Sequence, residues 1–459
     1  ITKDFRVHNA KQFEESFGET ADTYYLAIGR PQAFADNQAF NDGTDASPPT
    51  PVDSVGSVEY YAYDDFLSAK KITSSDVSLV IPRRNWTTGT TYDYYRHDYG
   101  DINSAGSVIS ANSGATSLYD ATFYVMNSTF DVYKVIDNNG DSASTVEPSG
   151  NKSTSVFSTG DSYKWKYMYS LSASEQANFL STDFMHVSTE SSDFSTTGGA
   201  IEHVKITAGG SGGTNGTYTD VDIRGDGSSG KATIVVASNA VSSVTITTAG
   251  SGYTYASVKA SDFGSVSGAD IDFIISPPGG HAADVVTELG GFFVMTNVDL
   301  TQADGSGDFS TGNDFRRIAL LRNPTDSTTG STASATTLDA TKSITFSGTP
   351  GSFQADEKIT QATTGAVGFV VDFNSTTKVL RYVQPQFADQ GVDSDGNLTA
   401  FASTHTVTGA TSSATGTPSS HDTTPELTHD TGDILYIENR KPISRAADQT
   451  ENVKLIVEF

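Results

Sequence analysis

Ser162-Tyr-Lys-Trp-Lys-Tyr-Met-Tyr-Ser-Leu171 alternates four aromatic side chains with lysine, methionine and serine. Such a period of two places the aromatic rings on one face of a β-strand. Rings opposite lysines are also able to stack on nucleic-acid bases. Because the rest of the chain is acidic, we favour a half-buried strand whose rings pack in a core.

Similar stretches rich in aromatic and β-branched residues predict further strands, at residues 24–28, 121–126, 130–136, 433–437 and 453–459. Helical patterns are few. Residues 5–17 place Phe13 and Phe17 one turn apart, and residues 64–72 lack glycine and proline. We therefore expect two short helices, an irregular loop at 42–51 and a mainly β chain.

The composition excludes several classes of function. The chain has 459 residues, 28 Lys+Arg against 55 Asp+Glu, a formal net charge of −27 and no cysteine. An acidic surface repels phosphate backbones and anionic lipid, so we expect neither a nucleic-acid nor a membrane partner. Without cysteine there is no disulfide, thiol nucleophile or cysteine-bound zinc. At about 150 residues per domain, the length predicts several domains.

No segment of the sequence has the character of a targeting or membrane element. The first residues contain no apolar core of signal-peptide length, and no later run approaches the roughly 18 apolar residues that a spanning helix needs. We expect a soluble chain that folds in a reducing compartment.

Two segments have the composition of separate β modules. Val204-Lys-Ile-Thr-Ala-Gly-Gly-Ser-Gly212 returns as Val244-Thr-Ile-Thr-Thr-Ala-Gly-Ser-Gly252, and each copy leads to a second apolar strand. Self-similarity of this kind predicts a β unit that buries one face against its copy. Residues 332–420 form the second segment, a β module on Ser/Thr-rich flanks.

Three short motif matches fit turns better than functional sites. Residues 209–213 match the nucleophile elbow and residues 225–230 match the dinucleotide fingerprint, yet neither is followed by a helical pattern. Arg224-Gly-Asp226 is an integrin-type tripeptide inside a glycine-rich turn. The eight histidines show no zinc spacing. We therefore predict no catalytic residue and no cofactor.

Two acidic loops have a pattern that resembles calcium-binding loops. Asp137, Asn139 and Asp141, and separately Asp393, Asp395 and Asn397, offer oxygens at alternate positions, as calcium loops do. Neither run continues to the glutamate of an EF-hand. Because Asx-rich turns are satisfied by their own backbone, we favour turns and predict no metal site.

Four segments, taken in order, carry a resemblance to a known family: Val80-Ile-Pro-Arg-Arg-Asn-Trp86, Thr159-Gly-Asp-Ser-Tyr-Lys-Trp-Lys-Tyr167, residues 315–324 and residues 432–442, the last continuing through 447–451. They resemble a baseplate wedge subunit of T-even-type contractile-tailed bacteriophages, the wedge protein that forms a homodimer. The resemblance covers roughly residues 1–190, 285–330 and 425–459. It leaves out the two β modules.

The resemblance implies a multi-domain β-sandwich core with an inserted β domain, to which this sequence adds two small β modules. The expected division is a core sandwich at 1–95, an inserted β domain at 96–197, a glycine-rich repeated module at 198–282, core again at 283–331, a β module at 332–422 and C-terminal core strands at 423–459. The family has a structural role, which implies that the chain is not an enzyme.

The family motifs supply the candidate structural or interface residues. Arginines suit forked pairing with carboxylates, Trp86 offers an apolar anchor, and residues 438–442 follow a strand and are expected to turn. For each we favour a contact inside the fold over a contact with a partner. The candidates are Pro82, Arg83, Arg84, Trp86, Tyr163, Trp165, Arg316, Asn323, Pro324, Glu438, Asn439, Arg440, Pro442, Asp448 and Gln449.

The function expected from the resemblance is that of a structural virion protein in the tail baseplate, assembled in the host cytoplasm. It would form a homodimer, dock onto other wedge proteins, and relay the rearrangement that precedes sheath contraction. The alternative is a tail protein that binds or depolymerises carbohydrate. In that case host glycans would meet the repeat module through exposed tyrosines such as Tyr218, Tyr253 and Tyr255.

Overall fold

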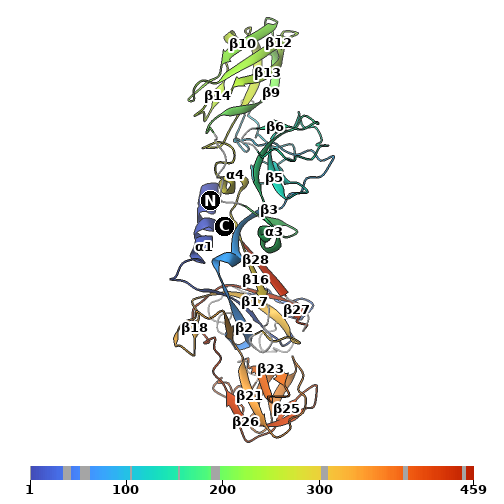
Figure 1. Ribbon diagram of the computed structural model, residues 1–459, viewed down its shortest axis with the longest axis vertical. Helices are drawn as coiled ribbons and strands as arrows, with labels where there is room; N and C mark the ends of the chain where they lie inside the picture. Colours follow the sequence, from blue (N-terminus) through green and yellow to red (C-terminus); the bar gives the residue numbers. More distant parts are fainter. Residues whose placement is uncertain are drawn as a thin grey trace. The chain divides into compact units, whose positions relative to one another are not determined.

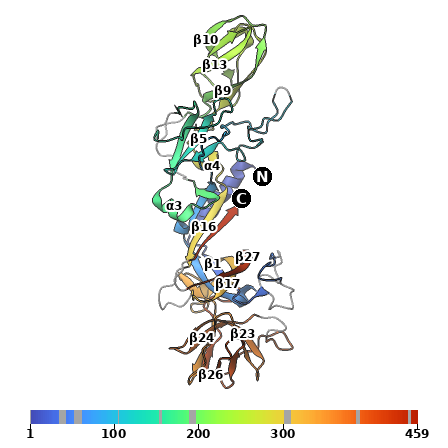
Figure 2. The same ribbon diagram turned by 90° about the vertical axis from the view of Figure 1, so that its right-hand side faces the viewer.

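The computed structural model describes residues 2–34, 43–51, 62–103, 106–152, 156–187, 197–300, 309–385, 391–446 and 451–459. The chain divides into two compact units (Figures 1 and 2). The first comprises Ile1–Gln12, Ser78–Met295 and Ile456–Phe459, and the second comprises Phe13–Val77 and Thr296–Leu455. Strands form most of the regular structure in both, which confirms the expected mainly β, multi-domain fold. No helix in the described ranges is long and apolar enough to span a membrane.

The aromatic strand of the first unit lies inside a four-stranded sheet of order β4-β5-β7-β6. These strands are β4 (Tyr124–Met126), β5 (Asp131–Asp137), β6 (Phe157–Ser158) and β7 (Lys164–Ser170). Trp165 is fully buried, as predicted, but so is most of Lys166 on the opposite face. Because the β5–β7 register shifts twice, the burial along β7 does not follow a simple alternation.

A second sheet has the order β28-β16-β3-β8, with β3 (Val77–Pro82), β8 (Phe184–His186), β16 (Phe293–Leu300) and β28 (Glu451–Glu458).

The predicted N-terminal helix is present as α1 (Lys3–Ser16). Helix α3 (Ala173–Phe179) begins with a capping box in which Ser172 and Glu175 each bond the other's backbone. Helix α4 (Val285–Leu289) begins at Asp284, whose side chain accepts from the N–H of Thr287.

The two sequence repeats pair crosswise. The first copy supplies β9 (Ile201–Ser211), β10 (Gly216–Asp222), β11 (Arg224–Gly225) and β12 (Lys231–Ala237), and the second supplies β13 (Ala240–Thr248), β14 (Ala256–Ser257) and β15 (Ser267–Ile275). Strand β9 pairs with β15 of the other copy, and β12 pairs with β13. One cluster of buried side chains, from Ile201 to Ile275, lies between them. Each copy thus completes the core of the other.

The second unit is built on a five-stranded sheet of order β20-β2-β1-β17-β27. Its strands are β1 (Tyr24–Gly29), β2 (Phe66–Ile72), β17 (Asp314–Arg322), β20 (Thr337–Asp339) and β27 (Asp433–Ser444). The central strand β1 is buried throughout. The short pair β18 (Thr325–Asp326) and β19 (Ser331–Thr332) follows β17.

The helix predicted at 64–72 was wrong. Residues Tyr63–Asp65 form one 3₁₀ turn, and Phe66 begins β2, which pairs with β1 along its whole length. Four successive residues of β2 are buried, so both faces of the strand are covered. A strand buried on both sides has no alternation of polar and apolar residues, and a short run of this kind resembles a helix face.

The turn predicted at 438–442 was also wrong, because these residues continue strand β27. Between Asn439, which pairs with Arg317, and Ile443, which pairs with Phe315, β27 contains two more residues than β17. Pro442 lies in this irregularity and on a strand at the border of its sheet. Proline is tolerated in such positions because no ladder hydrogen bond from its nitrogen is needed.

A closed six-stranded barrel of order β21-β24-β23-β22-β25-β26 forms the rest of the second unit (Figure 2). Its strands are β21 (Lys342–Ser347), β22 (Lys358–Gln361), β23 (Ala366–Asn374), β24 (Val379–Val383), β25 (Val407–Gly409) and β26 (Thr415–Asp422). Buried apolar side chains from Ile344 to Ala414 fill the interior. Closure leaves no unpaired strand edge around the barrel.

Candidate functional site

The arginines of the first family motif bind main-chain carbonyls inside the first unit. Arg83 donates to the carbonyl of Ser181 at 2.8 Å. Arg84 donates to the carbonyls of Tyr119, at 3.0 Å, and Ala121, and its guanidinium lies 4.5 Å from the Tyr124 ring centre. None of these three bonds is the carboxylate fork that arginine chemistry suggested. Arg83 therefore holds the end of β3 to the segment that precedes β8, and Arg84 holds it to the segment that precedes β4.

The other residues of these motifs also make contacts inside the fold. Pro82 ends β3 opposite Phe184 of β8, and half-buried Trp86 donates to the hydroxyl of Ser144 at 3.1 Å. Tyr163 and Trp165 are fully buried and stacked, with ring centres 5.4 Å apart. Rings so enclosed have no face free for a base or a sugar.

Arginines of β17 pair with carboxylates in the second unit. Arg316, which is 6 % exposed, forks onto Asp45 through two bonds of 2.9 Å and also donates to Asp314 at 3.2 Å. Burial alone would raise the pKa of Asp45, but the Arg316 fork outweighs it and lowers that pKa. Arg317 donates to Asp65 at 2.5 Å and to Asn439 at 3.1 Å.

Asp65 is the buried acid that this network is built around. It is fully buried and accepts from Gln32 at 3.1 Å, while a guanidinium nitrogen of Arg30 lies 3.9 Å away. Arg30 has a left-handed backbone with φ of 62°, which is rare for residues other than glycine. The sequence did not single out Asp65, because Arg317 lies 252 residues away along the chain.

The remaining predicted residues of the second unit lie at strand ends and at the sheet border. Asn323, with φ of 53°, accepts from the N–H of Thr23 at 2.7 Å, and the carbonyl of Pro324 accepts from Ala333. Glu438 accepts from Arg440 at 2.9 Å at the surface. Asn439 donates to the carbonyl of Pro49, whereas Pro442 is exposed. Asp448 and Gln449 lie outside the described residues.

Asp356 is a titratable group that sequence reasoning missed. It lies between β21 and β22 of the barrel, and its two carboxyl oxygens accept from the N–H of Asp314 at 3.1 and 2.9 Å. Burial, with the nearby Asp314 carboxylate, raises the pKa of Asp356 to about 7. The group therefore changes charge near neutral pH.

A buried ion pair lies in the first unit. Lys134 of β5 is 0 % exposed and donates to Glu288 of α4, which is 6 % exposed. The two residues are 154 positions apart, so no local pattern in the sequence points to the pair. Burial of two charges is tolerated only when each satisfies the other.

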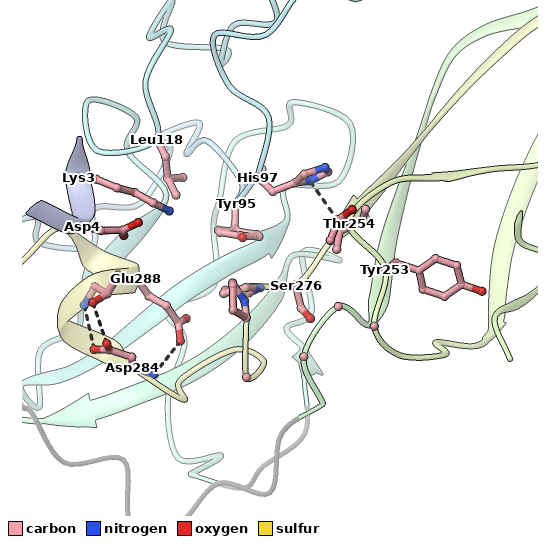
Figure 3. A pocket seen from close by; sticks show the side chains of 18 of the residues that line it. Lys3, Asp4, Tyr95, His97, Leu118, Tyr253, Thr254, Ser276, Asp284 and Glu288 are labelled. Atoms are coloured by element: carbon pink, nitrogen blue, oxygen red, sulfur yellow. Dashed lines mark hydrogen bonds between the residues drawn. The ribbon is translucent and has the colours of Figure 1, made fainter. Parts of the chain in front are cut away.

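Glu288 also lines a cavity of about 730 Å³ in the first unit (Figure 3). The wall combines Tyr95, His97, Ser276 and Asp284 with glycines from the two segments that join the repeat to the rest of the unit. Burial would raise the pKa of Asp284, but hydrogen bonds from Thr287 and the charge of Lys11 outweigh it and lower that pKa. Because Asp284 and Glu288 both take part in structural contacts, the cavity does not offer a free acid–base pair.

The calcium candidates form turns. Asp137 accepts from the N–H of Asn139, and Asp393 accepts from the N–H groups of Asp395 and Asn397. Asp141 and Asn139 have left-handed backbones, as Asx turns allow. Within the described ranges, no three His, Asp or Glu side chains are arranged to hold a metal ion.

The tyrosines proposed for glycan binding are not a common platform. Tyr253 is 2 % exposed, so its predicted exposure was wrong; its hydroxyl donates to the carbonyl of Ile223 and accepts from the N–H of Gly230. Figure 3 shows its ring pointing away from the other labelled side chains. Tyr218 is half-buried, whereas Tyr255 is 62 % exposed. As predicted, neither match is followed by a helix: the elbow match begins within β9 and the fingerprint match leads into β12.

Comparison with known families agrees with the motifs. Residues 1–145 match the family model Phage-Gp8, described as Bacteriophage T4, Gp8. This confirms the resemblance to the T4-type baseplate wedge protein that the sequence motifs indicated. The matched range contains α1, β1 to β5 and the Arg83–Arg84 motif. No curated protein matches the chain.

Proposed function

Because its N-terminal 145 residues are related to the phage Gp8 wedge protein, we propose that this chain is a structural subunit of a contractile-tail baseplate wedge. It forms a homodimer, docks onto other wedge proteins, and passes on the rearrangement that precedes sheath contraction. It assembles in the host cytoplasm and carries out no reaction. The family match is the observation that carries this proposal.

The contacts of the motif residues support a structural role. Arg83, Arg84 and Arg316 join segments that are distant in the sequence, and each is held by more than one acceptor. Bonds of this kind make the units rigid, since a charged donor with several partners resists local opening. A rigid block suits a subunit that moves as a body.

The charge of the chain limits the partners that fit it. With a net charge of −27, it is expected to meet basic surfaces on neighbouring wedge proteins, because like-charge contacts oppose association. The two added β modules, 198–282 and 332–422, lie outside the family match. We infer that they are peripheral to the contacts that build the wedge.

Reconstitution tests the proposal. The full chain is mixed with the other wedge proteins of its phage, and complexes are separated by size and identified by mass spectrometry. We expect a stable complex that contains this chain, and incomplete wedges when it is omitted. Wedges that assemble fully without it would contradict a structural role.

A matched variant separates the added modules from the wedge contacts. A chain without residues 200–276 is expected to enter the wedge as well as the full chain does. A chain with Arg84→Ala is expected to enter poorly, because the motif loop loses its anchors on Tyr119 and Ala121. The reverse order of effects would place the wedge contacts in the repeat.

A further inference from the structure

The border of the five-stranded sheet carries an open groove. Among the described residues, β27 pairs only with β17, so its outer edge has no neighbouring strand. The groove, of about 430 Å³, lies between β27 and β28. Its floor is apolar, with Phe315, Ile318 and Leu455, and charged residues of both strands form its rim. An apolar centre with a charged rim is the anatomy of a protein interface.

Two consecutive apolar side chains of β27 are exposed. Leu435 and Tyr436 are 42 % and 37 % exposed, and they are the two consecutive residues among the large apolar side chains exposed in the described ranges. Tyr436 pairs with Leu320 and Glu438 with Ile318, so both lie on the face that the groove opens into. The edge therefore offers both a groove and a side chain of a size to enter one.

The charges of β27 indicate which partner can bind at the outer edge of this strand. The strand holds two acids, Asp433 and Glu438, and two bases, Arg440 and Lys441, so its net charge is zero in a chain with 55 acids and 28 bases. A second copy of this chain is repelled by most of the acidic surface but not by this strand. In an antiparallel pairing centred on Ile437, Asp433 of each copy lies opposite Lys441 of the other. The same register places Tyr436 of each copy opposite Glu438 of the other, at the groove rim.

We propose that two copies of this chain join through β27, edge to edge and antiparallel, with Tyr436 of each copy seated over the groove of the other. The pairing ends at Pro442, which has no N–H to donate. Asp433 already pairs with Arg322 at 2.6 Å, and Arg440 with Glu438, but exposed pairs of this kind are weak and can be exchanged for a partner. This inference rests on the homodimer of the proposed function and assigns it a surface.

Charge exchange on the full chain tests the surface. D433K and K441D each place like charges opposite one another in both halves of the two-fold pairing. Each variant alone is expected to raise the dimer dissociation constant by at least about ten-fold, which corresponds to ~1.4 kcal/mol. The double variant, and a mixture of the two single variants, restore opposite charges and are expected to restore the dimer. Sedimentation equilibrium measures all four, with circular dichroism as a check of folding.

The possible outcomes separate the homodimer from the surface proposed for it. A wild-type chain that stays monomeric overturns the homodimer and this surface together. A dimer that persists in both single variants overturns the β27 edge and leaves the homodimer standing. Single variants that dissociate without recovery in the double variant or in the mixture also overturn the edge, because the loss is then structural. The exposed Lys259→Asp of the repeat is the matched control and should leave the dissociation constant unchanged.

Discussion

Asp356 shows how a single buried carboxyl makes a fold sensitive to pH. Its pKa is about 7 in the folded chain and 3.8 in the absence of the fold, so the folded state holds its proton more tightly. The contribution of Asp356 to the free energy of unfolding is therefore fully present below about pH 4 and is lost as the pH rises from about 4 to 7. The groups that face it are Asp314 and Arg316, of which the first opposes ionisation and the second favours it.

D356N removes this titration and keeps an oxygen that accepts from the N–H of Asp314. Asparagine also tolerates the left-handed backbone at this position, where φ is 63°. We expect the variant to be more stable than the wild type at pH 8, by about 1–3 kcal/mol, and the difference to shrink at pH 5. Thermal melts at both pH values measure it. An equal difference at the two values would refute the titration, and the exposed Asp395→Asn serves as control.

Removal of the cation from the buried Lys134–Glu288 ion pair is expected to destabilise the fold. K134M leaves the Glu288 carboxylate buried without its cation, which should cost about 3–5 kcal/mol of unfolding free energy. The double variant K134M/E288L replaces both charges by apolar groups and should recover most of that loss. Urea unfolding of the three proteins measures this. A double variant no more stable than K134M would mean that the pair is not what stabilises this site.

At the scale of elements, the sequence predicted those whose pattern is local. Strand β1 was predicted because it is a short continuous apolar run that ends at Gly29, and helix α1 because Phe13 and Phe17 lie one helical turn apart. Strand β2 was predicted as a helix because its covering layers come from distant segments. Residues 438–442 were predicted as a turn because an irregular register on a border strand leaves no sequence mark other than Pro442. The contacts of Asp65 and Glu288 were missed because their cationic partners are distant in the sequence. Arg317 lies 252 residues from Asp65, and Lys134 lies 154 residues from Glu288.

Tyr253 ties the two copies of the repeat together. Its buried hydroxyl bonds the carbonyl of Ile223 and the N–H of Gly230, which flank the turn between β10 and β12. Y253F leaves both groups without that partner and should reduce the protection of β10 and β12 amides by about 1–2 kcal/mol. Hydrogen exchange of these strands measures the effect. The exposed Tyr255→Phe is the control, and equal effects from both changes would show that the bond contributes nothing.

At the scale of the whole molecule, the family resemblance and the cysteine-free composition both fit a structural protein. Two β-rich units without cysteine rely on sheet cores and charged networks for their stability, and the motif residues in the described ranges mostly make contacts inside these units. The motifs could be recognised from the sequence, but their contacts could not, because a motif fixes residue types and not the segments that pack against them. The barrel and the repeat module are closed or self-completing. Such modules can be inserted without changing the core that holds them.

Electron microscopy of the assembled tail is the most direct test of a wedge subunit. If the chain is part of the baseplate wedge, a density map will place its two units inside the baseplate ring, in pairs of copies, with β27 of each pair at their contact. The same map of tails grown without the chain will show an incomplete baseplate. A complete baseplate in its absence, or density for the chain only at fibre tips or on the sheath, would contradict the proposed function.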